Sequence, residues 1–315
     1  MEAFGETVES TPPMRGHALF RHVFVPGVLA LSVASWVYRE KFEQVLRSSA
    51  ISIDYMSAVL LTLILCIWLA EQAYPERTEW NYQLLTNGVN GWNRLGRDLF
   101  YLFVVTQLSA LLINATALHL TSRINGLGVG LGVKALWPAG AAFPVRVALV
   151  FFTVEFFSYW THWAAHHFPL LWRFHSTHHV ITQLTGFKSL RVHPVENAVF
   201  YVARHAPLMF LGVGVEEMLT VTYLCSALGI LAHANISVSE GYLGWVVNFP
   251  RYHAVHHSSD LAESNSNFGC HTVLWDRVFG TFRSSAQSPL TIGVHPVGPR
   301  SLWQELGRPF LGPVG

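Results

Sequence analysis

The amino-acid sequence predicts an all-α integral membrane protein, a bundle of four to six spanning or re-entrant helices. Two observations lead to this prediction. Only 12% of the 315 residues are charged, about half of the ~25% typical of soluble domains. The hydrophobic residues, 51% of the chain, gather in runs close to the roughly 20 residues that a helix needs to cross the hydrocarbon core. A bilayer explains this composition better than a large dry core does.

Six apolar runs supply the predicted helices, and the first four are long enough to span a bilayer. The fifth is short and contains Arg204, His205 and Pro207, so we expect a kinked or partly re-entrant helix there. Alternate glycines between residues 126 and 132 predict a flexible connection outside the membrane, because no strand precedes them as a nucleotide-binding loop would require. In chain order the six runs are 20–38, 51–74, 99–120, 145–165, 199–213 and 218–238.

Charge and cysteine content argue against a nucleic-acid-binding protein and against a protein built on cysteine metal sites or disulfides. A net charge of +1 does not provide the basic face that nucleic acid requires. The three cysteines, Cys66, Cys225 and Cys270, lie far apart in the sequence and show neither metal-ligand spacing nor a disulfide framework. We therefore expect no nucleic-acid partner and interpret the cysteines as buried thiols.

Histidine is abundant, with 17 residues, and most of these are grouped. An HxxxH pair ends the fourth run, the pattern HxxHH occurs twice, and a single histidine precedes an asparagine at the end of the sixth run. Residues at i, i+3 and i+4 share one face of a helix, so each HxxHH is expected to aim three imidazoles at one point. The nine histidines of these groups are His162, His166, His175, His178, His179, His233, His253, His256 and His257.

Nine imidazoles predict a site for two metal ions, because one ion takes roughly four to six ligands. Imidazole suits iron, zinc, copper or nickel, whereas magnesium and calcium prefer oxygen. Glu155 precedes His162 by two helical turns and is expected to accept the outer N–H of a ligand histidine. His193 and His271 could line the site or satisfy local hydrogen bonds. His167 points about 100° away from His166 on a helix and is left out of the ligand set.

The order HxxxH, HxxHH, HxN, HxxHH, followed by Asn267-Phe-Gly269 and Trp275-Asp276-Arg-Val-Phe-Gly-Thr281, resembles the fatty acid hydroxylase/sterol desaturase superfamily over roughly residues 145–285. The resemblance implies that the nine histidines bind two irons. Candidates for supporting contacts behind these ligands are Glu155, His193, Asn235, Asn267 and Asp276.

The same resemblance implies a membrane bundle capped by a cytosolic helical lobe that holds both metals. Residues 1–140 would form an N-terminal tail and anchoring spans, 141–285 the catalytic domain, and 286–315 a C-terminal tail. An excess of Lys and Arg on the side where the histidine groups meet favours a site that faces the cytoplasm, in a bacterial inner membrane or the endoplasmic reticulum.

The activity implied is oxidation of a lipid C–H bond with O2, two irons and external electrons, and zinc could replace iron in purified protein. No fused haem-binding segment is recognised, so a separate ferredoxin or b-type cytochrome with its reductase is expected as the electron donor. Hydroxylation is preferred to desaturation, and the substrate could be a fatty acyl, sterol, terpenoid or ether lipid. A di-zinc intramembrane hydrolase and a metal transporter are the alternatives. Both fit poorly, because hydrolases usually mix carboxylates with histidines and transporters spread ligands along a path.

Overall fold

A computed structural model describes residues 15–48, 55–82, 84, 88–285, 287–289, 291–294 and 301–311. The predicted N-terminal tail up to residue 14 and parts of the predicted C-terminal tail lie outside these residues. Within the described residues the regular structure is helical, apart from two isolated β-bridges. The all-α prediction is confirmed.

The described residues form α-helices with short 3-10 and π-helical segments between them. Short 3-10 segments η1, η3, η4, η5 and η6 cover Thr78–Trp80, Val133–Leu136, Gly186–Leu190, Gly241–Trp245 and Arg308–Phe310, and a π-helical turn η2 covers Tyr101–Val105. The α-helices are α1 Arg15–Val37, α2 Arg39–Ser48, α3 Tyr55–Ala73, α4 Gly88–Phe100, α5 Thr106–Gly130, α6 Phe143–His167, α7 Pro169–His179, α8 Pro194–Leu211, α9 Val215–His233, α10 Pro250–His256, α11 Leu261–Ser264, α12 Leu274–Phe279 and α13 Leu302–Gly307.

Four helical stretches of the described chain are long and apolar enough to cross a membrane, within the predicted range of four to six. The predicted run 51–74 corresponds to a shorter apolar helix, Ser57–Ala73. The run 199–213 lies in α8, which continues through Pro207 and is not among the four. The four stretches are Ala18–Val37, Val89–Ala115, Phe143–His167 and Val215–His233.

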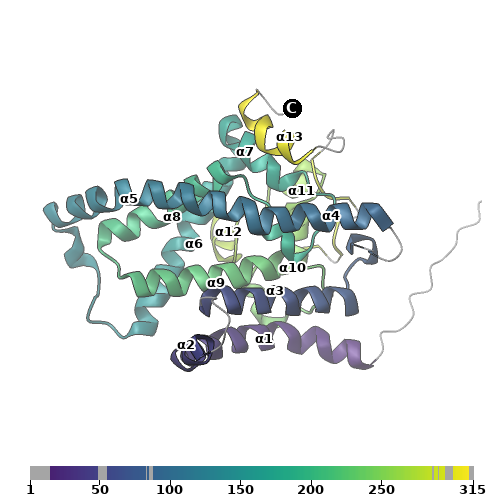
Figure 1. Ribbon diagram of the computed structural model, residues 1–315, viewed down its shortest axis with the longest axis horizontal. Coiled ribbons are helices and arrows are strands. Elements are labelled where there is room, and N and C mark those ends of the chain that lie inside the picture. The colour runs from purple at the N-terminus through teal and green to yellow at the C-terminus, as the bar shows by residue number, and fades with distance from the viewer. Residues whose placement is uncertain are drawn as a thin grey trace, which may run out of the picture.

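Helices α1, α3 and α9 lie side by side as roughly parallel rods, and α4 and α5 form a long band beyond them (Figure 1). Their shared core joins Val25 of α1, Ile64 and Ile67 of α3, and Leu228 and Leu231 of α9. Helices α7 and α10 gather with the C-terminal ends of α6 and α9, and α13 lies at the outer edge of this region (Figure 1). This arrangement brings the ends of four helices to one place.

The C-terminal segment is tied to the loop that follows α7. In α13, the Glu305 carboxylate is buried and accepts a hydrogen bond of 2.6 Å from Arg191. It also pairs with Arg97 of α4 and accepts from the Tyr101 hydroxyl. Part of the predicted C-terminal tail therefore packs against the lobe that carries the histidines.

The glycine-rich stretch was predicted as a flexible connection, and this prediction is wrong in part, because α5 extends through Gly130. Helix α5 packs along α8. A Cβ atom at Gly128 would lie 2.0 Å from the carbonyl oxygen of Phe210, whereas one at Gly126 would meet nothing within 4 Å. Small residues permit close helix approach in membranes, so Gly128 serves packing here.

Replacing Gly128 with alanine is therefore expected to lower the thermal unfolding temperature, by a destabilisation of about 1–3 kcal/mol typical of overpacking. Gly126→Ala is the matched control on the same helix. It should be neutral or slightly stabilising, because alanine favours the helix. Thermal unfolding of both variants in detergent tests this, and equal behaviour of the two would contradict the close contact.

Candidate metal centre

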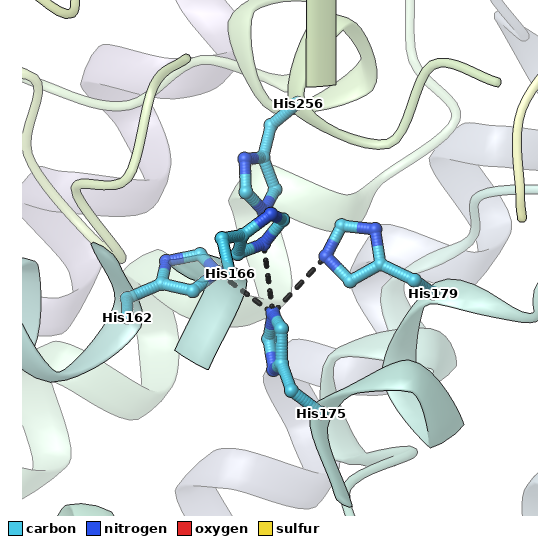
Figure 2. A group of neighbouring side chains, drawn as sticks. All are labelled: His162, His166, His175, His179 and His256. Carbon is cyan, nitrogen blue, oxygen red and sulfur yellow. Dashed lines mark hydrogen bonds between the residues drawn. The ribbon is translucent and has the colours of Figure 1, made fainter. Parts of the chain in front are cut away.

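Five imidazoles from three helices converge on one point. His162 and His166 come from the last turns of α6, His175 and His179 from α7, and His256 from α10 (Figure 2). The Nε2 atom of His175 lies 3.0 Å from that of His162 and 3.1 Å from those of His166 and His179. One ligand atom from each of the five residues lies within 4.8 Å of all the others. We call these residues the first group.

The other four predicted ligands form a second group beside the first. It contains His178 of α7, His233 of α9, and His253 and His257 at the end of α10. The Nε2 atom of His233 lies 3.1 Å from that of His178 and 2.9 Å from that of His253. The rings of His179 and His257 stack with centroids 4.4 Å apart, so the two groups are adjacent.

Each HxxHH motif is divided between the two groups. His175 and His179 belong to the first group and His178 to the second, whereas His253 and His257 belong to the second group and His256 to the first. The expectation that one motif aims three imidazoles at one point is therefore wrong. Successive residues of a helix are rotated by about 100°, so positions i+3 and i+4 diverge, and the i and i+4 pair faces a different point from i+3.

Proline occupies the first position of three helices around the histidine groups. Pro169, Pro194 and Pro250 open α7, α8 and α10, where the absent N–H costs nothing and the fixed φ favours helix. Because α7 and α10 are short, His178 and His179 lie in the last turn of α7, and His253 and His256 lie in the last turn of α10.

Five of the nine histidines turn their outer ring nitrogen, Nδ1, toward a protein acceptor. A carbonyl or carboxylate only accepts, so each bonded Nδ1 carries the proton, and in a neutral imidazole Nε2 then presents a lone pair. The Nδ1 donors and their acceptors are His162 to Phe268 O (2.7 Å), His256 to Ser266 O (2.8 Å), His233 to Gly229 O (2.8 Å), His178 to Arg191 O (3.3 Å) and His175 to the Glu196 carboxylate.

The donor set fits two transition-metal ions. In the first group the facing Nε2 atoms of His162 and His175 both present lone pairs, and in the second group those of His178 and His233 do so. Two lone pairs at this separation repel unless a cation lies between them. Burial also lowers the pKa of His175 to about 3, so it is neutral and able to bind metal at pH 7. Burial likewise holds the pKa values of His178, His179, His253, His256 and His257 well below the usual range.

Two of the predicted supporting residues lie apart from the histidine groups. Both carboxylate oxygens of Glu155 are bonded, one to His271 Nδ1 at 2.5 Å and the other to Thr272. Seven residues of helix separate Glu155 from His162 by roughly 10 Å, which is too far for the expected contact with a ligand. His193 caps α8 through Nδ1 and contacts the Leu306 carbonyl through Nε2.

The other three predicted supporting residues hold loops close to the groups. Asp276 accepts from the backbone N–H of Phe268 and Gly269, so it fixes the carbonyl to which His162 donates. Asn267 adopts a left-handed φ of 52° and donates to two backbone carbonyls. Asn235 bonds both the N–H and the carbonyl of Arg77, which fastens the segment after His233.

The sequence analysis missed Glu196, although it is the carboxylate that bonds a group member. It is buried in the first turn of α8 and contacts His175 Nδ1. The available signal was its place three residues after His193 at the start of an apolar helix. The backbone carbonyl acceptors gave no signal, because any residue type can supply them.

A cavity of about 400 Å³ borders both groups. It reaches His162 and His175 of the first group and His178, His233 and His253 of the second. Its other walls come mainly from α5, α8 and α9, with further residues from α6, η4 and the segment at Cys270 and His271. A bound molecule in this cavity would therefore face both candidate metal positions.

The fold and the site together define a helical membrane protein with two adjacent, histidine-only groups that open onto one cavity. Residues 147–281, which contain all nine histidines, match the family described as fatty acid hydroxylase. This match to the fatty acid hydroxylase family agrees with the resemblance that the motifs predicted.

Three curated relatives show the range of this family. The chain is 31% identical to the ornithine lipid hydroxylase of Rhizobium tropici, covering 55% of this chain and 53% of the relative. It is 29% identical to the alkylglycerol monooxygenase of Xenopus tropicalis over 47% and 33% of the two chains, and 30% identical to human lathosterol oxidase over 44% of each. The chain thus matches about half or less of each relative's length. No solved structure gives a significant match.

Proposed function

We propose that this chain is a membrane-bound di-iron oxygenase that uses O2 and external electrons to hydroxylate a C–H bond of a lipid. The convergence of nine imidazoles, eight of them buried, in two adjacent groups beside one cavity carries this proposal. Hydroxylation is preferred to desaturation because two of the three relatives above are a hydroxylase and a monooxygenase. The catalytic part would comprise residues 141–285, with 1–140 as tail and anchoring helices and 286–315 as a C-terminal tail.

The irons, when bound, would supply the activation of O2 for attack on an unactivated C–H bond, and zinc could occupy the same ligands in purified protein. The protein's own contribution is to orient the imidazoles. Phe268 O, Gly229 O and Ser266 O fix three rings through Nδ1, and Glu196 fixes a fourth. Such outer contacts set the tautomer and the direction of each lone pair. The walls of α5, α8 and α9 would hold the lipid and exclude water.

The proposal includes a site on the cytoplasmic side, in a bacterial inner membrane or the endoplasmic reticulum. The bias of Lys and Arg toward the side of the histidine groups supports this orientation. A separate ferredoxin or b-type cytochrome with its reductase would deliver electrons there.

Incorporation of oxygen-18 tests the function. Cells that express the protein under 18O2 are expected to accumulate a lipid one labelled oxygen heavier, and cells that express His256→Ala should lack it. Mass spectrometry of extracted lipids makes the measurement. A product that has instead lost two hydrogens would assign desaturation, and a lipid change that is independent of O2 would refute the oxygenase.

A further inference from the structure

One face of α8 forms a wall of the cavity and leads away from the metal groups. Asn197, Phe200, Tyr201 and Arg204 all line the cavity, as expected for residues three, four and seven apart on a helix. The metal end of this wall is fixed, because the preceding residue, Glu196, contacts His175. About two helical turns of α8 therefore separate the metal end of this wall, at Glu196, from its polar end, at Arg204.

Arg204 places a positive charge close to the first group. Its Nε donates to the Phe200 carbonyl at 3.0 Å, and its guanidinium carbon lies 5.8 Å from the centroid of the Phe200 ring. The same ring lies 6.2 Å from the ring of His162 and stacks on that of His175 at 6.4 Å. The Phe200 ring is thus a neighbour both of the guanidinium and of two members of the first group.

This charge has no carboxylate partner among the described residues. A guanidinium has five N–H donors, and the Nε bond to Phe200 uses one. Glu196 is the only acidic residue among the described residues that line the cavity, and it is bonded to His175. Arg204 is also the only lysine or arginine in that lining, where its part-buried side chain faces the cavity. A part-buried cation of this kind gains from an anionic partner.

We propose that Arg204 binds the anionic head group, a carboxylate or a phosphate, of the lipid that enters the cavity. Guanidinium matches both anions in a two-pronged geometry, and Asn197 and Tyr201 supply neutral polar groups on the same wall. The statement that this lipid is the substrate rests on the proposed function. The statement that it binds at Arg204 does not. Because the Phe200 ring neighbours both Arg204 and the first group, the oxidised C–H bond would lie close to the head group and not at the far end of the chain.

Binding of three lipids that share one acyl chain tests this site. The probes are a brominated fatty acid, the corresponding lysophosphatidic acid and the corresponding monoacylglycerol, measured by quenching of tryptophan fluorescence in nonionic detergent at a pH that ionises the acid. The wild-type protein is expected to bind at least one anionic lipid about ten- to a hundredfold more tightly than the neutral one, the range expected for hydrogen bonds to a charged group. Preference for the fatty acid alone would assign a carboxylate, and for the lysophosphatidic acid alone a phosphate.

Arg204→Gln should remove this preference and leave the affinity for the monoacylglycerol unchanged, while Arg204→Lys should keep part of it. Arg123→Gln, an exposed position on α5 outside the cavity lining, is the matched control. Equal binding of all three lipids by the wild type, or a preference that survives in Arg204→Gln, would overturn the proposal. Metal content, measured on the same samples, reports separately on the oxygenase. A chain without metal that still prefers anionic lipids through Arg204 would refute the oxygenase alone.

Discussion

His178→Ala and His256→Ala are each expected to remove about one of two iron ions per chain, because these residues belong to different groups. Loss of His178 leaves the second group with three imidazoles, and loss of His256 leaves the first with four. The remaining ligands in the damaged group cannot reproduce the lost donor, since both side chains are buried and the neighbouring rings of His162, His175 and His233 are fixed through Nδ1. Elemental analysis of protein purified in detergent from iron-supplemented cells measures the ratio of metal to chain.

His167→Ala is the matched control for both substitutions. This histidine adjoins His166 in sequence but is exposed and stacks on Trp163 with ring centroids 4.1 Å apart. Its removal should leave the metal content unchanged. A folded wild-type protein that binds no metal after reconstitution with iron would refute the centre. Loss of both ions in each single variant would instead show that the two groups bind metal as one unit.

The helices were predictable because they depend on local patterns. The apolar run 145–165 became α6, whose end is set by Pro169 at the start of α7. Composition and run length are properties of neighbouring residues, and so the all-α membrane class and the family motifs could be identified without coordinates. The course of α5 through Gly130 could not be. It depends on the close approach of α8 at Gly128, which is a contact between distant segments.

The candidate site was predictable as a set of residues and not as a geometry. Spacing identified nine histidines that the structure brings together, but it could not show that His178 and His179 face different groups. That division depends on the direction of each short helix relative to the others. Glu155 and Glu196 show the same difference. Both are buried carboxylates bonded to a histidine, and only the fold decides that the partner of Glu155 is His271 and that of Glu196 is His175.

Glu196→Ala is expected to weaken metal binding at the first group by about ten- to a hundredfold, the usual cost of removing the carboxylate behind a ligand histidine. His175 is central to that group, since its Nε2 lies within 3.1 Å of three others. Without the carboxylate its Nδ1–H would be buried without an acceptor, and its ring would lose its fixed direction. Glu196→Gln keeps an oxygen that can accept from Nδ1 but removes the charge, so a smaller loss is expected. Titration with a competing chelator measures both affinities.

Glu155→Gln is the comparison that separates this effect from general damage to the lobe. Glu155 is equally buried and also bonds a histidine, but His271 belongs to neither histidine group. Its replacement should lower the unfolding temperature and leave the affinity for metal unchanged. If both carboxylates proved equally important for metal binding, the effect of Glu196 would be one of packing. If only Glu196→Ala released metal, and only from the first group, the carboxylate would act through His175, as its contact indicates.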